Sequence, residues 1–419
     1  MNTGVEEVLD RLRRLGSRGG TLRIFYNSDL DSVSAASIAF AASRRLGVKV
    51  VARPYNVVLD LSKVRNEVFD EDLILAIGLL VKGEPAALGV KEMLIVEPGE
   101  YPQRKEQALA GPASAALAAF EALGGGSPLQ LIRSIVGYYA TRCYLSDGRC
   151  GDVAGVASKG GDLLDSSPET LMSALRLSLP IDASIYLTIY PSLASMLGDA
   201  PTISEGLRGA GVCSERCPTL AEVERRRELA SALRSYASSA LPGDLVGRIF
   251  SRRIVLRSEA GVLSDLSDLS LLEEMLLLKE GPQRALSDSL SAYPGVVRAG
   301  MGALPEAVKL VSRWASQAKR SASGRARAIV DEFEASNAAL AEVLLKSATF
   351  PVAEGDQVLA IRIRSGVGGS YLVSARRRAA VEGLLAEAEG MGAHYVWSGA
   401  LARVWVPAEE DRRFLSLMT

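Results

Sequence analysis

Between residues 21 and 122, short runs of Val, Ile and Leu alternate with segments of helix-forming residues. The apolar runs are "TLRIFY", "VKVVARP", "DLILAIGLL" and "EMLIVEPG", and the clearest intervening segment is "SVSAASIAFAASRRLG". Apolar strands that are separated by helices are typical of a parallel sheet covered on both faces. The alternation therefore predicts an α/β domain built on a parallel sheet, which we extend over residues 1–200.

The pattern changes twice further along the chain. Segments such as "TLAEVERRRELASALRSYASSAL", "LSLLEEMLLL" and "RARAIVDEFEASNAALAEVLLK" place apolar residues three and four positions apart, which predicts helices. From "DQVLAIRIRSG" the strand pattern returns, and it continues through "SYLVSARRR" and "ALARVWVP". We therefore expect a helical middle region over 201–345 and the core of a smaller C-terminal α/β domain over 346–419.

Composition excludes several classes of protein. With 419 residues, of which 48% are hydrophobic, the chain can bury two or three separate cores. No apolar run approaches the roughly 20 residues that cross a bilayer, and no secretory pattern opens the chain, so we expect a cytoplasmic protein with no membrane partner. The formal net charge of −1 argues against bulk coating of nucleic acid, and any such contact must come from a local basic groove.

Two aspartates stand where the first predicted strand gives way to a helix, in the segment "NSDLDS". In open parallel sheets, ligands bind at the carboxyl ends of strands, and two carboxylates in such a turn could hold one Mg²⁺ or Mn²⁺ ion. Alternatively, Asp31 or Ser32 accepts hydrogen bonds from the free N–H groups of the first helical turn. From the residues alone, both interpretations of Asp29 and Asp31 stay open.

This arrangement resembles the DHH phosphoesterase superfamily, whose first motif has the form D-x-D-G and here reads "DLDS", with Ser32 in the glycine position. In that family later strands end in a further aspartate and then in an Asp-His-His triplet. The matching strand ends here are "LILAIGLL" and "LIVEPGEYPQ", where the triplet has become Glu97-Pro98-Gly99. The family's small-residue helix matches "GPASAALAAFEALG", and "SIVGYYATR" stands at the fourth motif without its acid.

The C-terminal end resembles the DHH-associated domain of the same family. That domain carries a Ser-Ala-Arg strand and then a Gly-Gly-His loop, and this chain has "LVSARR" followed by "GAHYVWSG" and "ALARVWVP". The resemblance implies a nucleic-acid-binding cradle at Ser374, Arg376, Gly392 and His394. An arginine fork beside a loop of backbone N–H groups is a sensible phosphate site, although His394 could also pack beneath its loop.

The resemblance also implies what the chain has lost. Active members use two metal ions, held by aspartates and histidines, to activate water, but this chain has one histidine, and it belongs to the C-terminal loop. We therefore expect no catalytic residue, no cofactor, and a vestigial metal motif of Asp29, Asp31 and Glu97 in which the aspartates cap a helix. The alternative is an active single-strand exonuclease or phosphoesterase that uses these acids with Mn²⁺ or Mg²⁺.

Within the superfamily the chain looks like the RecJ branch. Its inactive relatives are the archaeal RecJ-like proteins that bind GINS and the eukaryotic replication protein that joins MCM and GINS in the CMG helicase. The resemblance thus implies a scaffold subunit of a replicative helicase complex, with the GINS complex and MCM helicase as partners and single-stranded DNA as a further contact. A stand-alone module that binds a single strand is another alternative.

Two further groups of residues leave alternatives open. Lys319, Arg320, Arg325 and Arg327 could form a basic strip beside the cradle or a solvated helix end. The four cysteines, Cys143, Cys150, Cys213 and Cys217, could form one or two disulfides, stay as buried thiols, or bind zinc. The preference for Arg over Lys fits a high-temperature or a high-GC organism. Because intracellular disulfides are common in hyperthermophiles, we rank disulfides first, buried thiols next and zinc last.

Overall fold

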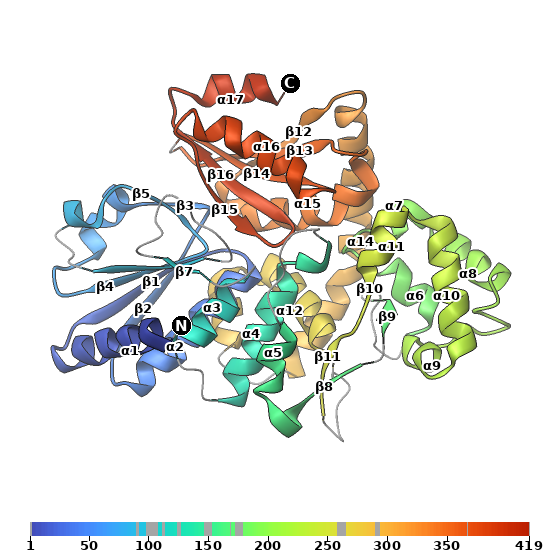
Figure 1. Cartoon of the computed structure of the whole chain (residues 1–419), viewed down its shortest axis with the longest axis horizontal. Helices are drawn as coiled ribbons and strands as arrows, with labels where there is room; N and C mark the ends of the chain where they lie inside the picture. Colours follow the sequence, from blue (N-terminus) through green and yellow to red (C-terminus); the bar gives the residue numbers. More distant parts are fainter. Residues whose placement is uncertain are drawn as a thin grey trace.

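A computed structural model describes residues 2–88, 92–97, 108–110, 114–123, 127–145, 153–167, 169–171, 179–257, 265–289, 294–366 and 368–418. It is a mixed α/β structure with two five-stranded sheets and a helical region beside them (Figure 1). None of the helices within these ranges is both long and apolar enough to cross a membrane.

The N-terminal sheet confirms the predicted parallel α/β architecture. Its strands are β1 (Thr21–Asn27), β2 (Lys49–Tyr55), β4 (Leu73–Ile77), β6 (Met93–Glu97) and β7 (Ala108–Ala110), in the order β2-β1-β4-β6-β7. All four neighbouring pairs run parallel. The carboxyl ends of β1, β4 and β6 therefore meet at one edge of the sheet, where the acidic motif was expected.

Helices cover one face of this sheet, and small residues let them approach it closely. The helices are α1 (Asn2–Ser17), α2 (Leu30–Arg45), α3 (Ala115–Ala122), α4 (Pro128–Ala140) and, after a short α5 (Val153–Ser158), the later α12 (Leu266–Glu280) and α13 (Pro282–Ser289). Gly137 of α4 shows how tight the packing is, since a Cβ there would lie 2.5 Å from the Cβ of Ala116. The alanine-rich composition of α2 and α3 is thus a packing requirement.

The middle of the chain is helical, as predicted, with two short antiparallel strand pairs. Strand β8 (Leu164–Ser166) pairs with β11 (Ile254–Leu256), and β9 (Thr170–Leu171) pairs with β10 (Phe250–Ser251). The remaining helices are α6 (Ile181–Tyr186), α7 (Ala194–Leu197), α8 (Ala200–Gly209), α9 (Leu220–Arg225), α10 (Arg227–Ala240), α11 (Gly243–Ile249) and α14 (Pro294–Ala322).

The prediction that residues 327–334 are helical is wrong. This segment forms strand β12 (Arg327–Glu334), which pairs in parallel with β13 (Val358–Arg364). Ala326, Ile329, Val330 and Phe333 stand three and four positions apart, which suggested a helix. The strand instead buries Ala328 and Val330, two positions apart, and leaves Ile329 and Phe333 partly exposed. The boundaries of the three regions at 200 and 345 stay predictions, but the C-terminal sheet already begins at β12.

The C-terminal sheet has the order β12-β13-β14-β16-β15, with β14 (Gly369–Ala375), β15 (His394–Ser398) and β16 (Leu401–Val406) running antiparallel to their neighbours. Its helices are α15 (Ala338–Val352), α16 (Arg378–Glu389) and α17 (Asp411–Leu417). One hydrophobic core contains residues of both large sheets, among them Ile74 and Ile95 from the first and Ile361 and Leu401 from the second. Strands β15 and β16 contact β5 (Leu80–Lys82), which pairs with β3 (Val58–Asp60), so the C-terminal sheet lies directly over the end of the N-terminal one (Figure 1).

Candidate functional site

Asp29 occupies the turn between β1 and α2, and it is the N-cap of α2. Its Oδ1 accepts a hydrogen bond of 2.9 Å from the backbone N–H of Ser32, and its Oδ2 accepts the Ser32 hydroxyl at 2.7 Å. The Asn27 amide donates to Oδ2 at 2.6 Å, and the carboxylate is 6% exposed. A carboxylate at this position satisfies N–H groups that an α-helix leaves free at its start.

Asp31 caps a different helix from the one in which it lies. It accepts hydrogen bonds from the Ser114 hydroxyl at 2.6 Å and from the backbone N–H groups of Ala115 at 2.7 Å and Ala116 at 3.0 Å. These donors form the N-terminus of α3, whereas the sequence had suggested that Asp31 or Ser32 caps α2. Asp31 cannot cap α2 because it lies inside that helix, and Asp29, with extended backbone angles, already occupies the N-cap.

A buried arginine from the C-terminal sheet reaches into the same site. Arg403 on β16 is fully buried, and its Nη2 donates to Oδ2 of Asp29 at 2.7 Å. Its Nε donates to Oε1 of Glu342 on α15 at 2.8 Å, and its Nη1 donates to the carbonyl oxygen of Gly78 at 3.0 Å. Lys346 adds a second positive charge, with its Nζ 3.5 Å from Glu342.

The charges around the two aspartates shift their pKa values in opposite directions. Burial alone raises the pKa of Asp29, but the positive charges of Arg403 and Lys346 and the bonds from Ser32 outweigh it and lower that pKa below its ordinary value. Burial and the neighbouring Asp29 carboxylate raise the pKa of Asp31 to about 7, against the opposing effect of its three hydrogen-bond donors. Asp29 is therefore the anion that the arginine neutralises.

The other two strand ends of the motif do not supply metal ligands within the described structure. Gly78 follows β4 with a φ of +62°, and a Cβ there would lie 2.1 Å from the Ser32 hydroxyl. A side chain at position 78 would therefore require the Ser32 hydroxyl to move. Glu97 ends β6, paired with Ala110 of β7, and the position of its side chain lies outside the described residues.

These residues do not fit the two-metal centre that the resemblance to DHH phosphoesterases implies. Both oxygens of Asp29 already accept hydrogen bonds, and a guanidinium group lies against one of them. A second cation at that oxygen would meet the charge of Arg403 at contact distance. Within the described ranges, no group of three or more His, Cys, Asp or Glu side chains is arranged to hold a metal.

Sequence reasoning missed Arg403, Glu342 and Lys346. Each carries a charge inside an apolar stretch: Arg403 in the strand "LARVWV", and the other two four residues apart in "AALAEVLLKSATF". Charged residues are almost never fully buried unless they are paired. That conflict between charge and apolar context was the available signal, although it could not indicate which partners meet.

The structure places two of the four cradle residues in internal contacts. Ser374 is buried, donates to the carbonyl oxygen of Ala400 at 2.9 Å, and accepts from the Thr349 hydroxyl at 3.0 Å. Arg376 donates to the carbonyl oxygen of Phe350 at 2.6 Å, and its guanidinium lies over the Phe350 ring.

The other two lie toward the opposite end of the sheet. His394 pairs with Trp405, which pairs with Ser370, so it stands four residues along β14 from the level of Ser374, or about 13 Å. Gly392 lies in the turn before β15 with a φ of +72°. The fold therefore does not bring Ser374, Arg376, Gly392 and His394 together into one cradle.

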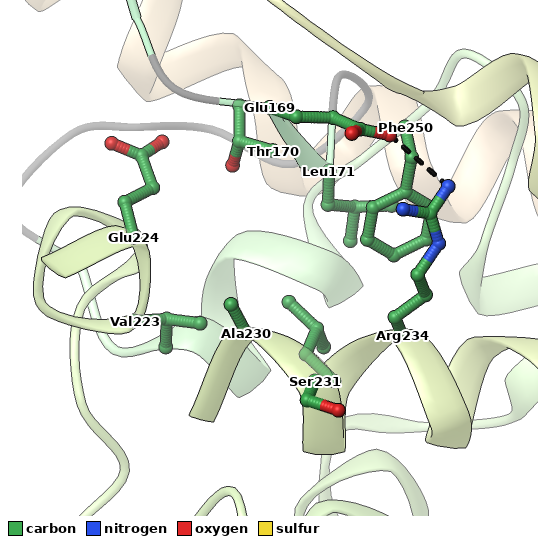
Figure 2. A pocket seen from close by; sticks show the side chains of 10 residues that line it. Glu169, Thr170, Leu171, Val223, Glu224, Ala230, Ser231, Arg234 and Phe250 are labelled. Atoms are coloured by element: carbon green, nitrogen blue, oxygen red, sulfur yellow. Dashed lines mark ion pairs between the residues drawn. The ribbon is translucent and has the colours of Figure 1, made fainter. Parts of the chain in front are cut away.

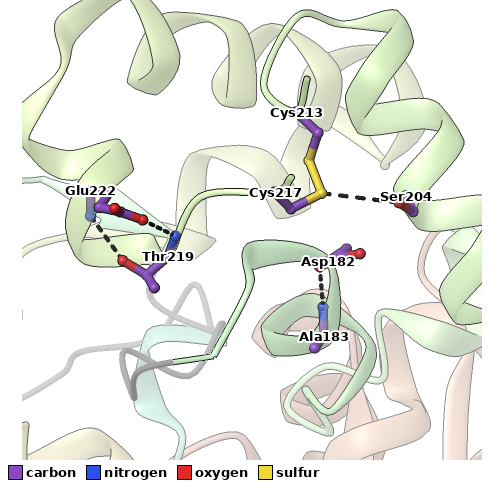
Figure 3. Close-up of a disulfide and its surroundings, with 7 residues drawn as sticks. All are labelled: Asp182, Ala183, Ser204, Cys213, Cys217, Thr219 and Glu222. Atoms are coloured by element: carbon purple, nitrogen blue, oxygen red, sulfur yellow. Dashed lines mark hydrogen bonds between the residues drawn. A yellow bond between two sulfur atoms is a disulfide. The ribbon is translucent and has the colours of Figure 1, made fainter. Parts of the chain in front are cut away.

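Cys213 and Cys217 form a disulfide in the helical region, which confirms the predicted preference for disulfides over zinc at this pair (Figure 3). The bond closes the loop between α8 and α9, beside the capping box in which Thr219 and Glu222 bond to each other's backbone N–H groups. Cys143 is disulfide-bonded as well. Cys150 lies outside the described residues.

An open recess of about 330 Å³ lies in the helical region, away from the strand-end acids (Figure 2). Leu171, Val223 and Phe250 contribute apolar side chains to its wall. At its rim Glu169 and Arg234 form an ion pair at 3.0 Å, and the Arg234 guanidinium lies over the Phe250 ring. The recess thus combines an apolar wall with charged side chains, one ion pair and the further carboxylate of Glu224.

Comparison with solved structures shows how the whole chain is related in fold. CDC45 from Entamoeba histolytica aligns with a TM-score of 0.63 and 11% identity, over 99% of this chain and 98% of that one. RecJ in complex with Mn²⁺ from Thermus thermophilus aligns at 0.45 with 14% identity, over 99% of this chain and 53% of that one. An exonuclease RecJ bound to manganese aligns at 0.41 with 15% identity, over 99% and 92%.

No protein-family model matches the sequence, and no curated protein matches it. The fold shared with CDC45 from Entamoeba histolytica extends over nearly the full length of both chains, although few residues are identical. This likeness is one of fold: the chain has the architecture of CDC45 from Entamoeba histolytica.

Proposed function

We propose that this protein is a non-catalytic DNA replication factor, a scaffold subunit of a CMG-like replicative helicase complex. The observation that carries the proposal is the position of Arg403, which neutralises Asp29 at the strand ends where active relatives hold metal. The full-length likeness to CDC45 supports the replication role. The family resemblance supplies the GINS complex and MCM helicase as partners and a cytoplasmic, archaeal setting.

We infer the absence of catalysis from the positive side chains that lie beside the acids at the strand ends. Arg403 and Lys346 place two positive charges beside Asp29 and Glu342 in a region closed to water. A two-metal mechanism needs several carboxylates free to neutralise two divalent ions held a few ångströms apart. Here these two carboxylates neutralise side chains of the protein itself, so we propose that Asp29, Asp31 and Glu97 are a remnant without catalytic role.

The same network explains why such a chain could serve as a scaffold. Arg403 belongs to the C-terminal sheet, Asp29 and Gly78 to the N-terminal sheet, and Glu342 to α15. A buried cation shared among these elements holds the two sheets in one arrangement, which leaves the outer surfaces in a fixed relation for partner binding. A stand-alone single-strand-binding module has less support, because the four candidate residues for that role do not converge.

Quantitative partner capture tests the proposal. The tagged full-length chain is expressed in its native host, purified at low and moderate salt, and the co-purifying proteins are quantified by mass spectrometry against an unrelated tagged protein. We expect the GINS subunits in near-stoichiometric amount at both salt concentrations, with MCM retained at the lower one. Recovery of neither GINS nor MCM at either salt concentration would contradict the scaffold role.

A further inference from the structure

The second half of α14 and the turn after it form the most one-sided charged segment of the chain. Residues 307–330 contain six Lys or Arg residues and no Asp or Glu, in a protein whose net charge is −1. Arg327 is neutralised by Glu387 across the surface, at 3.0 Å. The other five are Lys309, Arg313, Lys319, Arg320 and Arg325, all of them exposed.

Three of these side chains lie in one row along the helix. At 100° per residue, Lys309, Arg313 and Arg320 fall within about 40° of one another, and the row is about 16 Å long. The opposite face of α14 is apolar, and it buries Val311, Ala315 and Ala318 in the core that joins the two sheets. The row is thus held on a helix whose orientation is fixed by packing.

The described part of the protein does not pair the three charges of the row with acidic side chains. Within the described ranges, Lys309, Arg313 and Arg320 form no ion pair, whereas Arg133, Arg142, Arg253 and Arg403 each bind buried carboxylates. Lys319 and Arg320 stand in the last helical turn, where cations favour the helix dipole. Lys309 and Arg313 lie earlier in the helix, beyond the reach of that effect.

We propose that this row is a binding surface for the phosphate backbone of duplex DNA. Arginine forks and lysine side chains on one helix face are the groups that contact phosphates, and exposed Ser316 stands in the same row as a further hydroxyl. This inference goes beyond the scaffold role and does not depend on it. The contact depends on the charge and the spacing of these side chains.

The side chains of the row and its surroundings favour duplex DNA over two other acidic partners, a DNA single strand and an acidic protein. Tight binding of a single strand uses aromatic side chains on which bases stack, and the aromatic residue of this helix segment, Trp314, is buried with its Nε1 bonded to Asp331. Protein interfaces have an apolar centre surrounded by polar groups. The row has one exposed large apolar neighbour, Leu310, and is otherwise polar, as protein–DNA interfaces are.

The experiment uses the full chain and a labelled duplex of about 20 base pairs, followed by fluorescence anisotropy between about 50 and 200 mM salt. The test variant is Lys309→Gln/Arg313→Gln/Arg320→Gln. The matched control, Arg225→Gln/Arg226→Gln/Arg227→Gln, removes the same charge from an exposed segment where Glu222 and Glu228 lie close in sequence. Equilibrium unfolding verifies that both variants are folded.

We expect the test variant to bind the duplex at least about tenfold more weakly, and the slope of log affinity against log salt to decrease by about 3. The control variant should keep the wild-type slope. Equal binding by wild type and test variant, or an equal loss in the control, would overturn the proposal. Tighter binding of a single strand of equal length would also overturn it. Displacement of the duplex by a poly-glutamate peptide of equal charge would overturn it as well, because it would assign the row to an acidic protein.

Discussion

Replacing Arg403 by methionine removes the cation from the buried site while keeping much of the side-chain volume. The guanidinium makes hydrogen bonds to Asp29 at 2.7 Å, to Glu342 at 2.8 and 3.1 Å, and to the Gly78 carbonyl at 3.0 Å. In Arg403→Met, Asp29 keeps only neutral donors, and Glu342 keeps Lys346 at 3.5 Å. Removing one partner of a buried ion pair costs about 3–5 kcal/mol, so we expect a loss of that size in the free energy of unfolding.

Denaturation by urea, monitored at pH 7, measures this loss. The control is Arg364→Met, because Arg364 pairs with Glu332 and Glu334 at the surface and is 58% exposed. Exposed pairs contribute less than about 1 kcal/mol, so the control should change little. A loss below about 1 kcal/mol in Arg403→Met would refute the claim that this arginine neutralises the site.

The same variant should show a characteristic pH dependence. In the wild type the pKa of Asp29 is lowered by folding, so its contribution to stability is complete above its ordinary pKa and is lost as the pH falls through the lower folded value. Without Arg403 this carboxylate is buried with no guanidinium, and its pKa should rise. The difference in stability between wild type and variant should therefore shrink at acid pH, where Asp29 becomes protonated in the variant.

Three further changes test neighbouring features. Folding raises the pKa of Asp31 to about 7, so between about pH 4 and 7 the folded chain holds a proton that the unfolded chain releases. The stability of the wild type should therefore fall as the pH rises from about 4 to 7. In Asp31→Asn, thermal unfolding should no longer show this pH dependence. Gly78→Ala should lower the free energy of unfolding by about 2 kcal/mol or more, since its Cβ would overlap the Ser32 hydroxyl. In a double-mutant cycle, Ser32→Gly should recover part of that loss, and strict additivity of the two changes would contradict the overlap. Cys213→Ser should lower stability by about 2 kcal/mol under oxidising conditions, from the entropy of the short loop to Cys217, and by much less when dithiothreitol is present in both samples.

The sequence predicted those helices and strands that local patterns determine, and it failed where pairing between distant segments decides the structure. The parallel N-terminal sheet followed from apolar runs separated by helices, because strand and helix periods are local properties. Strand β12 was mistaken for a helix because Ala326, Ile329, Val330 and Phe333 have a helical spacing, and only the pairing with β13 decides for a strand. That pairing joins segments some thirty residues apart, which local patterns do not register.

The site was predictable in position but not in composition. The turn holding Asp29 and Asp31 lies at the strand ends, as expected, and both aspartates cap helices. The capping of α3 by Asp31 and the approach of Arg403 to Asp29 depend on contacts across 84 and 374 residues of sequence. The cradle prediction failed to converge for the same reason: motif order along the chain does not state at which end of a sheet a residue stands.

Digestion of a labelled single strand with excess Mn²⁺ tests whether Arg403 has replaced metal at the strand-end acids. The purified wild type is compared with Asp29→Asn/Asp31→Asn, which reveals any contaminating nuclease. We expect no cleavage above background by either protein. Cleavage by the wild type that is lost in the double variant would show that the two aspartates still hold metal, and the non-catalytic role would then be wrong.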